Sequence, residues 1–360
     1  MQLHFSNHER RRRSSRRSAL RMIGRWLALF AGSWWFVFAA SSAVSNHDGD
    51  AQLLGVWPPP PAEARVRYVQ SIASPPDLGI RPSAWNRFAN AISGGNKGRE
   101  TLVTPCGIAL DEADNLCLTD SGAATVWFFD RQRKKFQRWA EIGKTRFVSP
   151  VAVAKRKGTI FVADSGLGKV LAFDTNGKRL FEMTNSLERP AGLALSGDRL
   201  FVADPLAHRI AVFDLRGKFL SHFGKRGSGP GELNFPTHLA ADDRGQIFVT
   251  DSMNARIQVF TVEGEFQRTI SQKGDGSGHL NRPKGVAVDR RGQVFVVDAL
   301  FDNFQIFDPQ GEFLLDVGSA GSNAGEFWLP AGISISRSNQ VFVVDSYNRR
   351  VQVFQLLGEP

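Results

Sequence analysis

A short sequence pattern occurs six times along the chain. It consists of an apolar run ending in Asp, a polar step, and a second apolar run in which a Phe lies nine residues after the Asp, as in residues 247–260, IFVTDSMNARIQVF. A Pro precedes each Asp by 14 or 15 residues. The six Asp residues are Asp120, Asp164, Asp204, Asp251, Asp298 and Asp345. A repeat of 40 to 47 residues is typical of solenoids and propellers.

The content of one repeat decides between these two architectures. The repeat that begins at Pro283 contains four short runs of β-branched and aromatic residues, separated by turns rich in Gly, Asp and Asn. Four such strands make one propeller blade. The sequence therefore predicts an all-β, six-bladed β-propeller of four-stranded antiparallel blades, which start near residues 105, 150, 190, 236, 283 and 330.

Blade six ends at Phe354 after three strands, and the rest of the chain is too short for a fourth. Residues 65–72, RVRYVQSI, alternate like a strand but lie far from any blade. We expect this segment to supply the missing outer strand, which closes the ring and removes two exposed sheet edges. The propeller would then span residues 65–360, with a short amphipathic helix at 81–93 before blade one.

Several details of the repeat resemble the NHL-repeat family: the Pro-x-Gly start, the apolar run ending in Asp, the Asn-x-Arg step and the strand ending in Val-Phe. The resemblance extends over about residues 105–354 and departs at Thr125, Lys169 and Asn303, where the family has Arg. It implies the propeller fold. RNA binding and ubiquitin ligation occur among NHL proteins, but no row of stacking aromatic residues and no RING or B-box domain accompanies these repeats. We therefore expect no nucleic-acid partner.

The repeated Asp residues have a structural explanation. An Asp at a strand end accepts hydrogen bonds from backbone N–H groups of the following loop and pairs with an Arg five residues later. We expect such pairs for Asp204 with Arg209 and for Asp251 with Arg256. The structural Asp and Arg residues of the repeats are Asp164, Asp204, Arg209, Asp251, Arg256, Asp298, Asp345 and Arg350. The alternative is that some of these carboxylates bind a cation around the channel.

The positive charge of the chain is concentrated at its start. The formal net charge is +10, and residues 1–45 contribute +7 through eight Arg and one Glu. The uncharged run 26–45 follows the basic residues and ends in small residues, as in an export signal. Residues 1–45 are therefore predicted to be a signal peptide or an N-terminal membrane anchor, followed by a Pro-rich linker at 46–64. The protein would be periplasmic or secreted, or anchored to the inner membrane by 26–45.

The two cysteines lie on the first two strands of blade one. Hairpin register places Cys117 near Ala109 and Cys106 near Asp120, a separation too long for a relaxed disulfide. Cys117 also occupies a position that holds Phe in the other five blades. We expect buried free thiols, with a disulfide or a reactive or metal-binding thiol as the alternatives.

The residue two positions after each Pro begins the innermost strand beside the central channel. The six residues are Gly107, Ala152, Gly192, His238, Gly285 and Gly332. Five are small, as a crowded axis requires. We expect His238 to fill the channel and to hydrogen-bond a neighbouring blade. The alternative is that His238 serves a lyase or hydrolase as an acid–base group or as a ligand of zinc or calcium. Zinc catalysis needs about three protein ligands, and His208 is the one other His expected near this face.

Glycine-rich connections precede blades four, five and six. Such loops gather on one propeller face, where partners usually bind. We expect Phe235, Leu280 and Trp328 in these connections to tuck between blades. The residues predicted to form the binding face are Lys225, Arg226, His238, Lys284 and Trp328.

Together these features predict a monomeric, non-catalytic scaffold that binds a protein or peptide of the cell envelope and needs no cofactor. The metal-assisted lyase or hydrolase is the alternative. Binding of a carbohydrate that stacks on Trp127, Trp139 or Trp328 is a third possibility, although Trp127 lies within a strand and is expected in the core.

Overall fold

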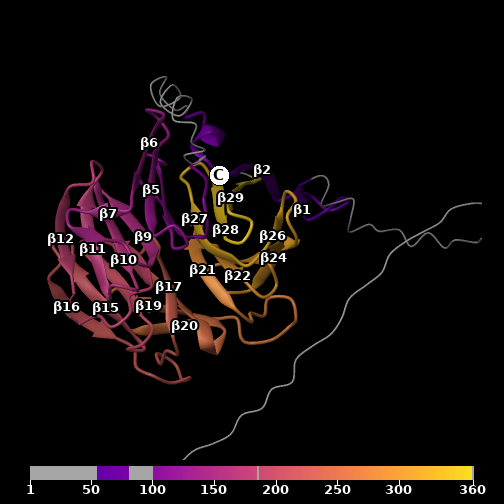
Figure 1. Cartoon of the computed structure of the whole chain (residues 1–360). Coiled ribbons are helices and arrows are strands. Elements are labelled where there is room, and N and C mark those ends of the chain that lie inside the picture. Colours follow the sequence, from indigo (N-terminus) through magenta and orange to yellow (C-terminus); the bar gives the residue numbers. More distant parts are fainter. Residues whose placement is uncertain (1–54, 81–99, 185, 359–360) are drawn as a thin grey trace, which may run out of the picture. The chain divides into compact units, whose positions relative to one another are not determined.

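The computed structural model describes residues 55–80, 100–184 and 186–358, and these form six large sheets, the blades, around a central axis (Figure 1). The first five sheets each contain four consecutive antiparallel strands, ordered from the axis outward. Blade one comprises β3 (Pro105–Leu110), β4 (Leu116–Asp120), β5 (Thr125–Asp130) and β6 (Lys135–Trp139). Blade two comprises β9 (Pro150–Arg156), β10 (Thr159–Asp164), β11 (Lys169–Asp174) and β12 (Arg179–Met183).

The next three blades repeat this arrangement. Blade three comprises β13 (Gly192–Ser196), β14 (Arg199–Asp204), β15 (Arg209–Asp214) and β16 (Phe219–Phe223). Blade four comprises β17 (Pro236–Ala241), β18 (Gln246–Asp251), β19 (Arg256–Thr261) and β20 (Phe266–Ile270). Blade five comprises β21 (Pro283–Val288), β22 (Val294–Asp298), β23 (Asn303–Phe307) and β24 (Phe313–Val317). The predicted all-β, six-bladed propeller is confirmed.

Blade six is assembled from both ends of the described chain. It contains β27 (Pro330–Ile335), β28 (Gln340–Asp345) and β29 (Arg350–Leu356), and its outer strands are β2 (Val66–Ile72) and β1 (Val56–Trp57). β2 runs antiparallel to β29, from the pair Val66–Leu356 to the pair Ile72–Val351. The closing strand is therefore confirmed. The innermost strand β27 lies against β3 of blade one, which completes the ring.

The predicted linker at 46–64 is wrong in its later part, because residues of this segment belong to blade six. Val56 and Trp57 pair with β2, and the Trp57 side chain is buried with its ring edge-on to Phe354 at 5.7 Å. The apolar Trp side chain gains more from this packing than from exposure in a spacer.

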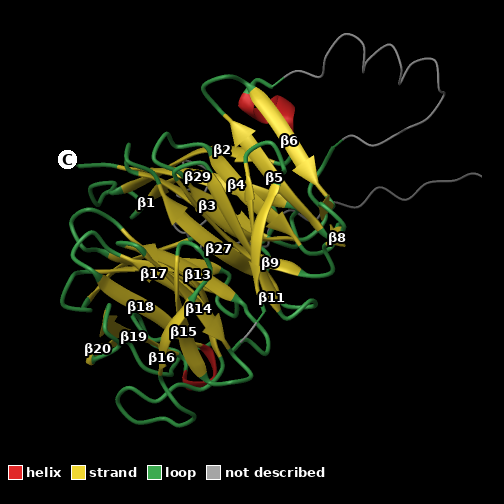
Figure 2. Ribbon diagram, turned by 90° about the vertical axis from the view of Figure 1, so that its left-hand side faces the viewer, coloured by secondary structure: helices red, strands yellow, loops and turns green. Residues whose placement is uncertain are grey.

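Short elements complete the described part of the chain. β7 (Glu141–Ile142) pairs with β8 (Thr145–Arg146), and β25 (Ser319–Ala320) pairs with β26 (Glu326–Phe327). Two 3₁₀ turns, η1 (Pro75–Leu78) and η2 (Ser252–Asn254), are visible in red in Figure 2.

The core consists of six apolar clusters within the described residues, and each combines side chains from two neighbouring blades. The second and third strands of each blade are buried along almost their whole length, as in β4 and β5. Blades that pack face to face bury both sides of these strands, which explains their continuous apolar runs. β2 contributes to two clusters, since Val66 packs between blades five and six and Ile72 between blades six and one.

The small residues at the axis have a steric cause. A Cβ atom added to Gly192 would lie 2.4 Å from the backbone oxygen of Thr237 in the next blade, and one added to Gly332 would lie 2.5 Å from that of Cys106. Any side chain here would force neighbouring innermost strands apart. The predicted crowding of the axis is therefore confirmed.

Both cysteines are free thiols, as predicted, although Cys106 is half-buried rather than buried. Cys117 pairs with Ala109 and is fully buried, whereas Asp120 lies opposite Pro105 rather than Cys106 because a bulge shifts the register after Pro105. Burial raises the pKa of both thiols, so neither is a ready nucleophile.

Some predictions concern residues outside those that the structure describes. The signal peptide or membrane anchor at 1–45, the linker up to residue 54 and the helix at 81–93 all lie there. Within 55–80, 100–184 and 186–358, none of the helices has the length and apolar character needed to cross a membrane.

Candidate functional site

The six repeated Asp residues hold the connections between blades in place. All six are fully buried. Their carboxylates accept hydrogen bonds from backbone N–H groups 15 to 17 residues earlier in the chain, as Asp120 does from Val103 (2.7 Å) and Asp164 does from Val148 (2.8 Å). The prediction placed these donors in the following loop, which supplies some of them, as in blades two and five. The Asp residues therefore have a structural role.

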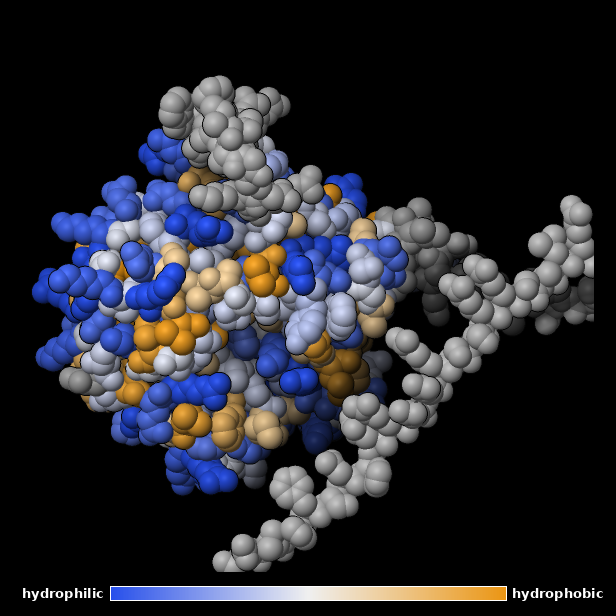
Figure 3. Space-filling view, in the orientation of Figure 1, coloured by the Kyte–Doolittle hydropathy of each residue, from blue (hydrophilic) through white to orange (hydrophobic). Residues whose placement is uncertain are grey.

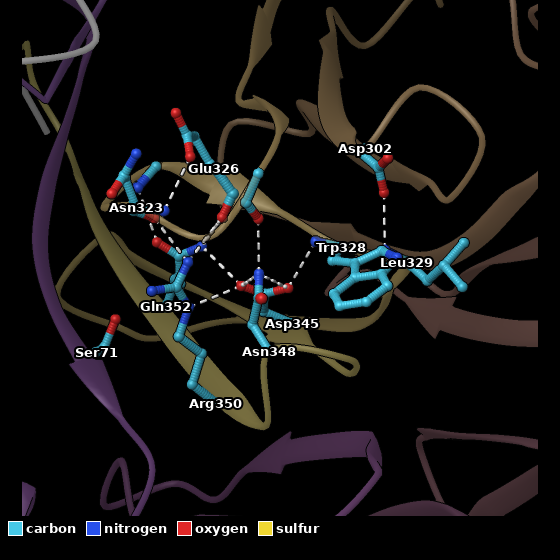
Figure 4. Close-up of polar contacts among 12 residues, drawn as sticks. Ser71, Asp302, Asn323, Glu326, Trp328, Leu329, Asp345, Asn348, Arg350 and Gln352 are labelled. Carbon is cyan, nitrogen blue, oxygen red and sulfur yellow. Dashed lines mark hydrogen bonds and ion pairs between the residues drawn. The ribbon is translucent and has the colours of Figure 1, made fainter. Parts of the chain in front are cut away.

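The predicted Asp–Arg pairs form in blades four and six but not in blade three. Arg256 Nε lies 2.9 Å from Asp251. Arg350 Nε lies 2.7 Å from Asp345 (Figure 4). In both blades the arginine also donates to carbonyl oxygens of the preceding glycine-rich connection. Blade three is preceded by a shorter connection, and Arg209 donates to the carbonyl of Ser186 instead of pairing with Asp204. The prediction for Asp204 and Arg209 was wrong.

One face of the propeller contains both the loops that follow the Asp residues and the connections that precede the Pro residues. We call it the connection face. In five blades a backbone N–H just after the Asp donates to a carbonyl of the connection, as Met253 does to Asn234 and Tyr347 does to Trp328. All innermost strands begin at this face, because they run in the same direction along the axis.

Exposed apolar side chains surround the channel on this face, and every blade supplies at least one. Four of them lie two residues after the repeated Asp. We call the set the apolar ring: Val103, Val148, Leu206, Phe235, Met253, Leu300, Trp328 and Tyr347. Met253 is 65% exposed, Tyr347 55% and Leu300 53%. The three other large exposed apolar residues of the described chain lie on outer strands, so the ring is a concentration rather than a random scatter.

A space-filling view shows hydrophobic residues separated by hydrophilic ones around a central hollow on one face of the molecule (Figure 3). Sequence reasoning missed the apolar ring. The repeat alignment contained a signal for it, because the position two residues after the Asp holds Leu206, Met253, Leu300 and Tyr347 in four successive blades.

Trp328 and Phe235 do not tuck between blades as predicted. Trp328 is 54% exposed, and its ring points away from the Asp345 network (Figure 4). The Trp328 ring lies 5.4 Å from the ring of Tyr347. Phe235 is also exposed, whereas Leu280 is buried as predicted. Short bridges within the connections turn the residue three positions before the Pro inward. That position holds Leu233, Leu280 and Phe327, all fully buried.

The basic candidates differ in their surroundings. Lys225 and Arg226 are exposed on the connection before blade four, and Lys225 lies 3.4 Å from Glu232. Lys284 is not an exposed face residue, contrary to the prediction. It is half-buried beside the channel, where burial and then the charge of Arg282 lower its pKa.

His238 lines the narrowest part of the channel, a space of about 40 Å³ shared with the glycines of the axis. Its Nδ1 lies 3.0 Å from the hydroxyl of Thr237 on the same strand, whereas the prediction placed the hydrogen-bond partner in a neighbouring blade. The His238 side chain is half-buried beside this space. Burial and then the charge of Lys284 lower its pKa from 6.5 to about 3. The imidazole is therefore neutral at physiological pH.

His208 does not join His238. Its Nδ1 accepts the backbone N–H of Phe235 at 3.3 Å, and its ring lies edge-on to the Phe235 ring. Within the described ranges, no three His, Cys, Asp or Glu side chains gather as metal ligands would.

The lowered pKa of His238 predicts a specific dependence of stability on pH. Below about pH 6.5 the unfolded chain binds a proton at this residue, and the folded protein binds it only near pH 3, so acid favours unfolding. We expect the stability of the wild type relative to His238→Gln to fall by up to about 1.4 kcal/mol per pH unit between pH 6 and 4. Urea unfolding at several pH values measures this difference, and parallel pH profiles of the two proteins would contradict it.

The opposite end of the channel is wider. A cavity of about 540 Å³ is lined by the ends of the innermost strands and by the turns that follow them. Its wall includes a buried ion pair between Lys155 and Asp111. Although burial alone would raise the pKa of Asp111, hydrogen bonds from Lys155 and Asn115 keep it below its usual value. The Asp111 carboxylate is thus already paired with Asn115 of its own hairpin and with Lys155 of blade two.

These features define a closed, six-bladed β-propeller with an apolar ring on its connection face. A family model described as a 6-bladed beta-propeller matches residues 184–246, 238–299 and 288–360. The chain therefore has the fold of the six-bladed β-propellers.

Solved structures agree with this fold. A streptogramin B lyase aligns with a TM-score of 0.53 at 14% identity, over 71% of this chain and 94% of the other. Virginiamycin B lyase from Staphylococcus aureus gives a TM-score of 0.53 at 14% identity, over 71% and 96%. A structural genomics protein of unknown function from Bacteroides thetaiotaomicron gives 0.56 at 15% identity, over 73% and 72%. At these identities the likeness is one of fold.

Proposed function

We propose that this protein is a non-catalytic, extracytoplasmic propeller of the NHL-repeat type, which binds a protein or peptide on its connection face. The apolar ring is the observation that carries the proposal. Large apolar side chains exposed together on a rigid scaffold are characteristic of interaction surfaces. The exposed Lys225 and Arg226 lie on the same face and would contribute polar contacts at its rim.

The proposed location follows from the sequence of residues 1–45, which has the pattern of an export signal or membrane anchor. The partner would then be a component of the cell envelope. A single propeller with a closed ring has no unpaired blade that requires a second copy, so we propose a monomer.

The alternative is a metal-assisted lyase or hydrolase at the channel. A neutral imidazole is the form that binds a metal or accepts a proton, and His238 has this form. The neighbouring Lys284 disfavours a second cation at the same place, and the space beside His238 is small. Metal content, measured in the wild type and in His238→Ala, separates the alternatives. Near-stoichiometric zinc or calcium that the substitution removes would favour the enzyme.

Two leucines of blade three provide a matched test of the binding face. Leu206 and Leu220 are both 45% exposed, but Leu206 belongs to the apolar ring and Leu220 to the outer strand β16. A photo-crosslinking amino acid placed at Leu206 is expected to give a discrete crosslinked partner in native cells, and one at Leu220 is not. We further expect Leu206→Glu to weaken capture of that partner at least about tenfold.

The control variant Leu220→Glu should leave capture unchanged. Equal crosslinking from the two positions, or capture that survives Leu206→Glu, would contradict the proposed face.

A further inference from the structure

Blade five lacks an arginine that fills a defined space in blades four and six. In blade four the Arg256 Nη2 atom donates to the carbonyls of Gly229 (2.9 Å) and Glu232 (3.0 Å). In blade six Arg350 makes the same two contacts with its own connection. Asn303 occupies this position in blade five, and its side chain is too short to reach the connection. The space that the guanidinium group would occupy is therefore left open.

A cavity of about 190 Å³ lies at this place. It is bounded by the connection before blade five, by the side chains of β23 and by the outer strand β24. The lining residues are Asp275, Gly276, Ser277, Gly278, Phe301, Asn303, Gln305, Phe313 and Asp316. Gly276 corresponds in the repeat to Gly229, whose carbonyl accepts the arginine in blade four.

Two buried amide oxygens in the cavity wall have no hydrogen-bond partner. Asn303 is 8% exposed and Gln305 is 4% exposed, and both side-chain oxygens are unsatisfied within the described structure. The Gln305 amide is oriented by its Nε2 atom, which donates to the carbonyl of His279 at 2.9 Å. In blades four and six the equivalent glutamine oxygens each accept a backbone N–H at 2.9 Å. Unsatisfied buried acceptors are costly, and a donor supplied from outside would relieve the cost.

The charge of the wall favours a cationic donor. Asp275 and Asp316 are the charged side chains among the lining residues, and no Lys or Arg is present there. Phe301 and Phe313 add two aromatic side chains. A guanidinium group is planar, carries five N–H donors and stacks on aromatic rings. It matches both the acceptors and the aromatic surfaces, whereas an ammonium ion matches only the acceptors.

We propose that the blade-five cavity binds a guanidinium group supplied by a ligand, in the place that Arg256 and Arg350 occupy in their own blades. Phe301 directly follows Leu300 of the apolar ring, so the cavity adjoins the proposed binding face. The source of the group would be an arginine side chain of the bound protein or a free guanidino compound. The inference depends on the proposed function only for the first of these sources.

The test uses thermal unfolding of the full chain in guanidinium chloride at roughly 1 to 20 mM, far below denaturing concentrations, with potassium chloride as the salt control. Ligand binding to the folded state raises Tm. We expect a saturable rise in Tm for the wild type. In Asn303→Arg the cavity is filled as in blades four and six, so this variant should be more stable and should not respond.

A second variant covers the case in which Asn303→Arg does not fold. Gln305→Met keeps the side-chain length but removes the acceptor, and is expected to raise the guanidinium concentration for half-maximal stabilisation at least about tenfold. A wild type that does not respond to guanidinium, a variant that responds equally, or a larger rise in Tm with calcium or potassium would each overturn the proposal.

N-acetyl-arginine amide and N-acetyl-lysine amide identify the source and the selectivity. Stabilisation by the arginine derivative and not by the lysine derivative supports a partner arginine, and stabilisation by guanidinium alone supports a small free compound. Equal stabilisation by both derivatives would overturn guanidinium selectivity. Crosslinking from Leu206 does not involve this cavity, so failure here and failure of the binding face can be told apart.

Discussion

Replacing Ile72 by Asp is expected to remove most of the stability of the propeller. Ile72 is fully buried on the closing strand β2 and packs between blades six and one. The substitution leaves a cavity and places an unpaired carboxylate in an apolar environment, at a cost of about 3–5 kcal/mol. Most domains of this kind are stable by only about 5–15 kcal/mol, so the loss is severe.

Val69 on the same strand provides the matched control. It is 42% exposed, and Val69→Asp adds the same charge to the same sheet without entering the core. We expect Val69→Asp to change the free energy of unfolding by less than about 1 kcal/mol in urea titrations. Equal destabilisation by the two substitutions would show that β2 contributes only as a sheet edge.

Arg350→Ala is expected to be the second large effect, because it leaves a buried carboxylate without its cation. The Arg350 Nε atom lies 2.7 Å from Asp345, which is fully buried, and the guanidinium also fixes two carbonyls of the connection. Removing one partner of a buried ion pair costs about 3–5 kcal/mol. The remaining donors to Asp345 come from Trp328, Asn348 and Gln352, so we expect a loss near the lower end of this range.

Arg209 occupies the same repeat position in blade three and forms no pair with Asp204. Arg209→Ala is therefore expected to cost less than about 1 kcal/mol in the same denaturation experiment. Equal losses in the two variants would mean that the arginine acts through packing of its aliphatic part rather than through the ion pair.

The fold could be predicted because its determinants are local and repeated. Pro, Asp and Phe recur in a fixed register, and each marks a strand end whose hydrophobic pattern is unambiguous. The closing strand could be predicted by counting strands, because blade six has only three strands from its own repeat and would otherwise expose an unpaired outer edge. Burial of Cys117 and the crowding at Gly192 and Gly332 also follow from position in the repeat alone.

The conformation of the connections between blades could not be predicted from the sequence in the same way. Trp328 follows the buried Phe327 directly, and which of two adjacent side chains turns inward depends on short bridges that have no sequence signature. The failure of the Arg209 pair likewise depends on the length of a connection rather than on Arg209 itself. The departure at Asn303 was visible in the sequence, but its consequence is a cavity that forms only when the glycine-rich connection closes over β23.

The pairing of β2 with β29 also sets the order in which the molecule can be completed. During synthesis β2 emerges ahead of blades one to five, whereas its partner β29 is made after them. Five blades can form while β2 is still unpaired. Val66 and Ile72 then lack their core contacts. A chain that stops short of Arg350 would keep that edge available for pairing with another molecule. Pairing of β29 with β2 thus converts an open, association-prone spiral into a sealed ring.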